Sequence, residues 1–130
     1  MEGVRATFNK RERLVSQRLI DMLFGQSASH SLAAFPLRAI YHVRERQEGD
    51  EPIQMLVSVP KKRFHHAVDR NRVKRQVREA YRQHKQRLYD ALPPDKALLV
   101  AFVWLSDRHL PTDEVVSRVE SLIQRISERL

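Results

Sequence analysis

The sequence predicts an α+β fold, a two-layer sandwich in which helices pack on a small mixed sheet. Three observations predict it. Helical and strand patterns follow one another in the order helix, two strands, helix, strand, helix. Residues 97–105 form a nearly continuous apolar run, typical of a central strand, and residues 112–130 carry an apolar stripe at helical spacing. With 130 residues and 42% hydrophobic content, the chain is expected to form one domain, residues 1–130.

The first element is an amphipathic helix predicted within residues 9–24 and ended by Gly25. Two starting points stay open. Asn9 and Glu12 could form a capping box, whereas Ser16 could cap a shorter helix that begins at Gln17. Residues 25–35 are mainly small and polar, as in a connecting segment.

Two strands follow, at residues 37–43 and 53–59. The polar segment between them, residues 44–52, is typical of a hairpin connection, so the strands are expected to be antiparallel neighbours. The next predicted helix begins at about Asp69, and Pro93 and Pro94 end it. Thr112 is expected to cap the last helix. The core stripe of that helix consists of Val115, Val116, Val119, Leu122, Ile123, Ile126 and Leu130.

Positive charge is concentrated between Pro60 and Tyr89. This stretch holds eleven Lys or Arg, and only two acids lie within it. Its apolar residues recur at helical spacing from about Asp69 onward and predict a helix with one buried face. At ~100° per residue, the other face is almost purely cationic. The cations on that face are Arg72, Lys74, Arg75, Arg78, Arg82 and Lys85.

A solvent-exposed helix is usually stabilised by ion pairs between its own side chains. This helix has too few acids to pair with its cations in that way. Arg grips phosphate oxygens in a bidentate fork, and double-helical RNA is recognised through its phosphates, 2′-hydroxyls and shape. The helix therefore predicts binding to a structured RNA. Asn71 could bond a base edge or a ribose, or it could bond nearby backbone in the first turn. His84 lies on the apolar stripe and is expected at the core or its boundary.

Other classes of function are disfavoured by the sequence. The chain has no Cys, which excludes disulfides, thiolate metal sites and a Cys nucleophile. It has no membrane-length apolar run and no signal-peptide pattern, so a soluble, cytoplasmic protein is expected. Its six His are scattered, and no Asp or Glu lies at a spacing typical of a catalytic acid–base pair or a metal site. We therefore expect no catalytic side chain and no metal ligands on the protein.

The basic helix also resembles a known family. Lys61-Lys62 follows a strand, Ala67-Val68 comes next, and then 70–75 (Arg-Asn-Arg-Val-Lys-Arg) and 78–82 (Arg-Glu-Ala-Tyr-Arg). These motifs resemble the protein subunit of bacterial ribonuclease P, whose signature is the Arg-Asn-Arg helix. Weaker matches at Phe8, Arg13-Leu14 and Phe24 extend the resemblance along almost the whole chain.

The resemblance implies a fold and an activity. The fold would contain a left-handed βαβ crossover around the basic helix, similar to domain 2 of ribosomal protein S5. The activity would be that of a ribonucleoprotein endoribonuclease that removes the 5′ leader of precursor tRNA, with the catalytic centre and its Mg²⁺ ions on the RNA subunit. The implied partners are ribonuclease P RNA and precursor tRNA, with no membrane and no protein partner.

By the same resemblance, two groups of residues would bind RNA. The basic helix would dock on the RNA subunit through Arg70, Asn71, Arg72, Lys74, Arg75, Arg78 and Arg82. A cleft between the sheet and the first helix would hold the leader, lined by Ile20, Phe24 and Tyr41, with Lys61 and Lys62 nearby. From the pattern alone, Phe24 and Tyr41 could equally be core residues.

This chain departs from the family pattern in two places. Ile20 occupies a position that is often aromatic. The loop before Arg70 has Pro60, lacks a Gly after the lysine pair and is one residue longer. A ribosomal or RNA-assembly protein of similar fold is the alternative function, because it would use the same basic helix on another RNA.

Overall fold

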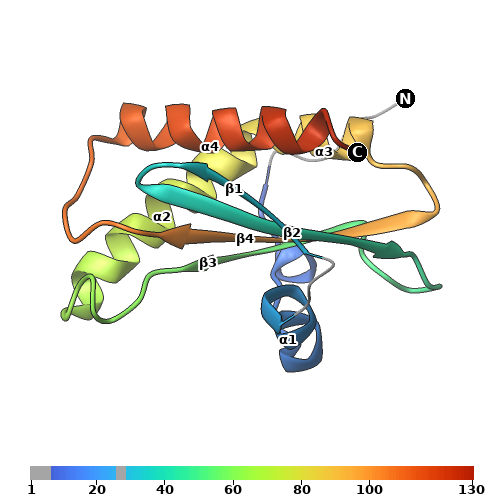
Figure 1. Ribbon diagram of the computed structural model, residues 1–130, viewed down its shortest axis with the longest axis horizontal. Helices are drawn as coiled ribbons and strands as arrows, with labels where there is room; N and C mark the ends of the chain where they lie inside the picture. The colour runs from blue at the N-terminus through green and yellow to red at the C-terminus, as the bar shows by residue number, and fades with distance from the viewer. Residues whose placement is uncertain (1–6, 26–28) are drawn as a thin grey trace.

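The computed structural model describes residues 7–25 and 29–130 (Figure 1). The elements are the 3₁₀ helix η1 (Lys10–Glu12), α1 (Gln17–Gly25), β1 (His30–Ala34), β2 (Leu37–Glu45), β3 (Ile53–Ser58), α2 (Ala67–His84), α3 (Gln86–Ala91), β4 (Lys96–Trp104) and α4 (Thr112–Ser127). The α+β fold with a mixed sheet is confirmed. No helix of the described ranges is long and apolar enough to cross a bilayer.

The four strands lie in the order β1-β2-β4-β3. β4 pairs antiparallel with β2 and parallel with β3. The prediction that β2 and β3 are neighbours is therefore wrong. The physical reason is that β4, apolar on both faces, is best buried in the centre of the sheet. The parallel pair β3 and β4 is joined through α2 and α3, as a βαβ crossover requires.

β1 was not predicted from the sequence. It is an edge strand that pairs antiparallel with β2, from His30 opposite Tyr41 to Ala34 opposite Leu37. Its sequence contains Ser and Ala, and only Leu32 is buried. Backbone hydrogen bonds to β2 hold such a strand without the apolar alternation that reveals strands in a sequence.

The N-terminal region forms two short helices in place of one helix over residues 9–24. Both alternative caps are present. Asn9 Oδ1 accepts a hydrogen bond from the Glu12 N–H (3.3 Å), and Glu12 Oε2 accepts one from the Asn9 N–H (3.0 Å). These two bonds are the capping box at the start of η1. Ser16 Oγ accepts from the Leu19 N–H (3.4 Å) at the start of α1. Between the two helices, the Leu14 N–H donates to the Met55 carbonyl (3.0 Å), so the segment covers the free edge of β3.

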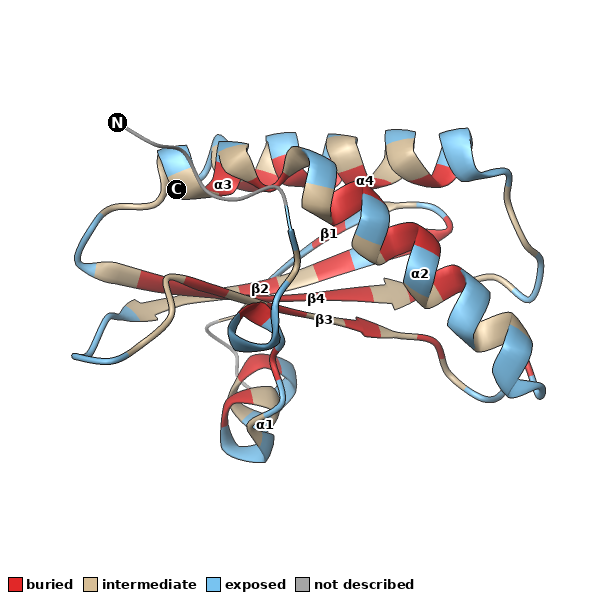
Figure 2. Ribbon diagram, turned by 180° about the vertical axis from the view of Figure 1, so that it is seen from behind, coloured by how far each residue is buried: buried red, intermediate tan, exposed pale blue. Residues whose placement is uncertain are grey.

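The core has two parts, one on each face of the sheet (Figures 1 and 2). α2, α3 and α4 cover one face and enclose the main cluster, which includes Val100, Phe102 and Trp104 of β4. α1 covers part of the opposite face, where Leu19 and Leu23 pack on Leu99 and Ala101. The two-layer description holds for the main core, and α1 adds a short helix on the other side.

The apolar stripe of the basic helix is confirmed. Val73, Val77, Ala80 and Tyr81 of α2 are fully buried, and His84 is half-buried at the boundary of the core. α2 begins at Ala67, two residues before the predicted start, and the helical run breaks at Lys85 into the separate helix α3.

The last helix has the predicted stripe but not the predicted cap. Val115, Val119, Leu122, Ile123 and Ile126 are buried, and Val116 and Leu130 pack against the core. Thr112 is the first residue of α4, and the helix has no side-chain cap. The Thr112 hydroxyl instead accepts a hydrogen bond from Gln76 Nε2 (3.0 Å), which ties the start of α4 to α2.

Candidate nucleic-acid interface

The outer face of α2 carries four cations, Arg72, Lys74, Arg75 and Arg78, which we call the cationic face. Arg72 and Arg75 are exposed, and Lys74 and Arg78 are partly exposed. Over residues 7–25 and 29–130, none of the four lies within ion-pair distance of a carboxylate. α2 packs its apolar stripe on the sheet, so these cations are held outward on a rigid helix.

Two other predicted RNA ligands have partners inside the chain. Arg70 donates through Nη1 to the backbone carbonyls of Phe64 and His65, both at 2.8 Å, and so fixes the loop before α2. Arg82 pairs with Glu79 at 2.5 Å. Hydrogen bonding from Arg82 holds the pKa of the Glu79 carboxyl below its usual value.

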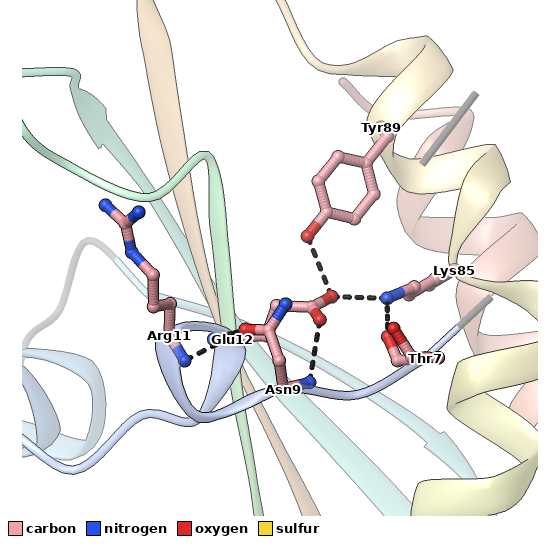
Figure 3. A network of polar contacts seen from close by, with 6 residues as sticks. All are labelled: Thr7, Asn9, Arg11, Glu12, Lys85 and Tyr89. Atoms are coloured by element: carbon pink, nitrogen blue, oxygen red, sulfur yellow. Dashed lines mark hydrogen bonds and ion pairs between the residues drawn. The ribbon is translucent and has the colours of Figure 1, made fainter. Parts of the chain in front are cut away.

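Lys85 was expected on the cationic face, and this prediction is wrong. Its side chain is 2% exposed and its ammonium lies 2.5 Å from Glu12 Oε1. The ammonium also donates to the Thr7 carbonyl (Figure 3). The helical wheel failed here because the break after His84 places Lys85 in the junction between α2 and α3, where the N-terminal segment covers it.

Glu12 is the centre of this network. Its carboxylate accepts hydrogen bonds from Lys85, from the Tyr89 hydroxyl (3.1 Å) and from the Asn9 N–H (3.0 Å), as Figure 3 shows. Burial, followed by the negative charge of Glu12, raises the pKa of Tyr89 well above its usual value. The network therefore fastens the segment around η1 to the end of α2 and the start of α3.

This attachment creates a concave site at the cationic face, which we call the arginine pocket. Its volume is about 440 Å³. It is lined by Phe8, Arg13, Asn71, Arg75, Arg78, Glu79 and Arg82. Phe8 and Arg13 come from the N-terminal segment and the other residues from α2. Partial burial, followed by repulsion from Arg13, lowers the pKa of Arg78.

Asn71 had two possible roles in the sequence. The structure gives its side chain no hydrogen bond to nearby backbone among the described residues, and it lines the arginine pocket. Its amide can both donate and accept, so it is available to a ligand there.

The residues expected to line the leader cleft do not all come together. Ile20 is half-buried and packs on the smaller core, and Phe24 is 46% exposed. Tyr41 is 2% exposed and belongs to the main core on the opposite face of the sheet. Side chains alternate along β2, so its neighbours Ile40 and His42 point to the α1 face. Tyr41 is therefore a core residue, and its placement in the cleft is wrong.

Lys61 and Lys62 are exposed in the loop that follows β3. Figure 1 shows this loop at the end of the sheet, to one side of α1. The α1 face of the sheet reaches toward that end and is only partly covered there. Its partly exposed residues are Ile40, His42, Leu56, Ser58 and Val103.

Phe8 and Arg13 were not predicted as site residues, although they were noted as part of the family resemblance. The irregular segment that carries them has no periodicity to indicate its position. Its contacts with α2 join residues some seventy positions apart, as the Glu12–Lys85 pair illustrates. Only the tertiary fold reveals that these residues complete the pocket.

The charge of the pocket also decides which ligands suit it. Four guanidinium groups and one carboxylate repel metal cations and attract anions. In the described parts of the chain, no group of three or more His, Cys, Asp or Glu is placed to hold a metal ion.

Comparison with known proteins identifies the family of the chain. The family model described as Ribonuclease P matches residues 8–127. The ribonuclease P protein component of Porphyromonas gingivalis strain ATCC 33277 is 42% identical over 124 residues, covering 92% of this chain and 88% of its own. That of Chlorobium phaeobacteroides is 40% identical over 93 residues, covering 68% and 62%.

Solved structures show the same fold. The RNase P protein of Staphylococcus aureus superposes with a TM-score of 0.68 at 19% identity, covering 88% of this chain and 94% of its own. The protein from Thermotoga maritima gives a TM-score of 0.63 at 22% identity, covering 88% and 96%. Since the family model spans nearly all of the described residues and relatives exceed 40% identity, the chain belongs to the ribonuclease P protein family.

Proposed function

We propose that this chain is the protein subunit of an RNA-based ribonuclease P, which removes the 5′ leader of precursor tRNA. In this proposal the cationic face of α2 docks on the RNA subunit and the α1 face of the sheet holds the leader. The observation that carries the proposal is that Arg72, Lys74, Arg75 and Arg78 are held outward by α2 without a carboxylate partner among the described residues.

The electrostatic argument concerns repulsion between two RNA molecules. A catalytic RNA and its substrate both carry a phosphate charge at every nucleotide, and cations at their contact offset that repulsion. Arg side chains on a rigid helix suit this purpose, because RNA double helices are recognised by their phosphates and shape. The protein thereby lowers the concentration of Mg²⁺ needed for substrate to bind.

The leader is proposed to lie on the α1 face of the sheet. Phe24 is exposed on α1, and an aromatic ring can stack on a base without regard to sequence. Ile20 and the partly exposed residues Ile40 and His42 extend this surface, and Lys61 and Lys62 could follow the phosphate backbone at its end. Such binding holds the scissile bond in register, which contributes to catalysis by positioning.

Catalysis itself is assigned to the RNA subunit, which would also bind most of the Mg²⁺. Mg²⁺ prefers carboxylates, water and substrate phosphates as ligands. The arginine pocket is positively charged and would repel Mg²⁺. We therefore give the protein's side chains no catalytic role and no metal ligand. We expect the protein to act in the cytoplasm.

The test is reconstitution with a bacterial ribonuclease P RNA. We expect the purified chain to stimulate 5′ processing of a precursor tRNA at low Mg²⁺, where the RNA alone is weak. The Arg72→Ala, Arg75→Ala double variant is expected to stimulate less. Cleavage that is unchanged by the wild-type chain would contradict the proposal and favour the alternative, a ribosomal or RNA-assembly protein that uses the same helix.

A further inference from the structure

The arginine pocket has features that a flat phosphate-binding helix does not need. We propose that it binds one unstacked nucleotide of the RNA subunit, with the phosphate between Arg13 and the guanidinium groups of α2 and a base or ribose edge at Asn71. This inference rests on the proposed function, since it assumes that α2 docks on that RNA. It adds Arg13 as a specific ligand and Phe8 as a positioning residue, and it assigns Asn71 a contact with a single nucleotide.

The charge of the pocket favours an anion. Of its four guanidinium groups, that of Arg82 is hydrogen-bonded to Glu79, the single carboxylate of the lining. Arg13, Arg75 and Arg78 have no carboxylate within ion-pair distance in residues 7–25 and 29–130. Three guanidinium groups around one cavity repel one another, and a bound phosphate would relieve that repulsion through charge-assisted hydrogen bonds.

Arg13 is held in place before any ligand arrives. Its guanidinium lies 5.6 Å from the centre of the Phe8 ring, within cation–π distance. Phe8 in turn meets Tyr81 edge-on at 5.8 Å. The buried pair of Glu12 and Lys85 fixes the backbone between Phe8 and Arg13. An arginine side chain that is already held in position loses less conformational entropy on binding a phosphate than a free surface arginine would.

The pocket is also larger than a phosphate requires. A volume of about 440 Å³ lies within the range of roughly 300–1,000 Å³ typical of small-molecule sites. One tetrahedral anion would leave most of it empty. The remaining space adjoins Asn71, whose amide has no partner among the described residues and can bond a base edge or a 2′-hydroxyl.

The shape indicates which part of an RNA can enter. A concave pocket cannot reach the bases of a regular duplex, which are stacked and paired. Unstacked nucleotides occur in loops and bulges, and these are the usual targets of specific RNA recognition. A guanidinium plane can also stack on an exposed base. An extruded nucleotide of the RNA subunit therefore fits the pocket better than a run of helical phosphates.

The first experiment uses small probes on the free protein. In a two-dimensional NMR titration we expect adenosine 5′-monophosphate to shift the side-chain signals of Arg13, Arg75, Arg78 and Asn71. Inorganic phosphate should shift the three arginines and leave Asn71 largely unchanged. If the monophosphate does not shift Asn71 more than phosphate does, the nucleotide assignment is wrong. If neither probe shifts Arg13, the pocket does not bind anions in this way.

The second experiment measures binding to ribonuclease P RNA as a function of salt. Arg13→Gln is compared with Arg11→Gln, which removes the same charge from the same segment but outside the pocket, where Arg11 pairs with Glu51. We expect Arg13→Gln to weaken binding about tenfold, near 1.4 kcal/mol. It should also lower the log–log salt slope by about 0.7–0.9, as expected for one lost phosphate contact. Arg11→Gln should change neither quantity by a comparable amount.

The outcome separates this inference from the proposed function. If Arg72→Ala and Lys74→Ala, which lie on the cationic face outside the pocket, weaken RNA binding but Arg13→Gln behaves like Arg11→Gln, the pocket assignment fails and the docking of α2 stands. If none of these variants weakens binding, the docking of α2 fails as well. Thermal melting of each variant checks that it is folded. A photo-crosslinker at Phe8 should attach to the RNA subunit, and attachment only to precursor tRNA would contradict the assignment.

Discussion

Lys85 and Glu12 form an ion pair that is almost completely withdrawn from water, with 2% and 5% of their side chains exposed. The two residues are 73 positions apart, and their contact joins the N-terminal segment to the end of α2. Burying charges is costly unless each finds partners, and here the Tyr89 hydroxyl, the Asn9 N–H and the Thr7 carbonyl complete the network. Lys85, which the helical pattern placed on the outward cationic face, is therefore structural.

Removing one member of this pair should destabilise the fold. We expect Lys85→Met to lower the free energy of unfolding by about 3–5 kcal/mol, because Glu12 would be left charged and buried. Lys85→Met combined with Glu12→Gln should recover part of that loss. Chemical denaturation measures both, with the exposed Arg72→Ala as a control expected to stay within about 0.5 kcal/mol of the wild type. A stable Lys85→Met protein with weakened RNA binding would return Lys85 to the cationic face.

The cationic face should determine the salt dependence of RNA binding. We expect Arg72→Ala and Arg75→Ala each to lower the slope of log K against log salt by roughly 0.7–0.9 per lost phosphate contact. Arg129→Ala, at the exposed end of the chain beyond α4, is the matched control and should leave the slope unchanged. Equal slopes for all these variants would show that α2 does not contact phosphate.

Replacing Phe24 should weaken binding of the 5′ leader and leave binding of mature tRNA unchanged. We expect Phe24→Ala to weaken binding of a precursor with a long leader by about 1–3 kcal/mol, the contribution of one stacked base, and to spare mature tRNA. Phe35→Ala is the control, because Phe35 is also exposed, at 67%, but lies at the turn between β1 and β2. Melting accompanies both, and equal losses for long-leader precursor and mature tRNA would contradict a leader site.

Tyr41 is expected to matter for stability alone. It is buried in the main core, so Tyr41→Ala should lower the free energy of unfolding by about 3–5 kcal/mol. Tyr41→Leu keeps more of the buried volume and should lose less. At a temperature where both variants are folded, their preference for long leaders should match the wild type, and a selective loss of that preference would place Tyr41 in the cleft after all.

Alkaline pH should destabilise the protein through two tyrosines. Burial raises the pKa of Tyr81 and of Tyr89, and the charge of Glu12 adds to the effect at Tyr89. The folded state thus favours the neutral phenols, whereas in the unfolded chain they ionise near pH 10. Their contribution to stability is complete below pH about 10 and is lost as pH rises through the folded-state pKa values. Denaturation at a series of pH values measures this, and Tyr89→Phe should reduce the dependence.

The sequence alone determined much of this protein. Repeated apolar spacing identified α2 and α4 and their buried stripes, and the unbroken apolar run identified β4 as the central strand. These predictions succeed because burial of a helix or strand face depends mainly on residues close together in the chain. The scarcity of acids likewise identified the cationic face, and the Arg-Asn-Arg motif by itself indicated the family.

The tertiary structure decided what depends on distant contacts. It placed β4 between β2 and β3 and turned Tyr41 away from α1, because strand order and facing are set by pairing across the sheet. It buried Lys85 against Glu12 and brought Phe8 and Arg13 to α2 to form the arginine pocket. No local pattern encodes such contacts, since each joins segments separated by most of the domain.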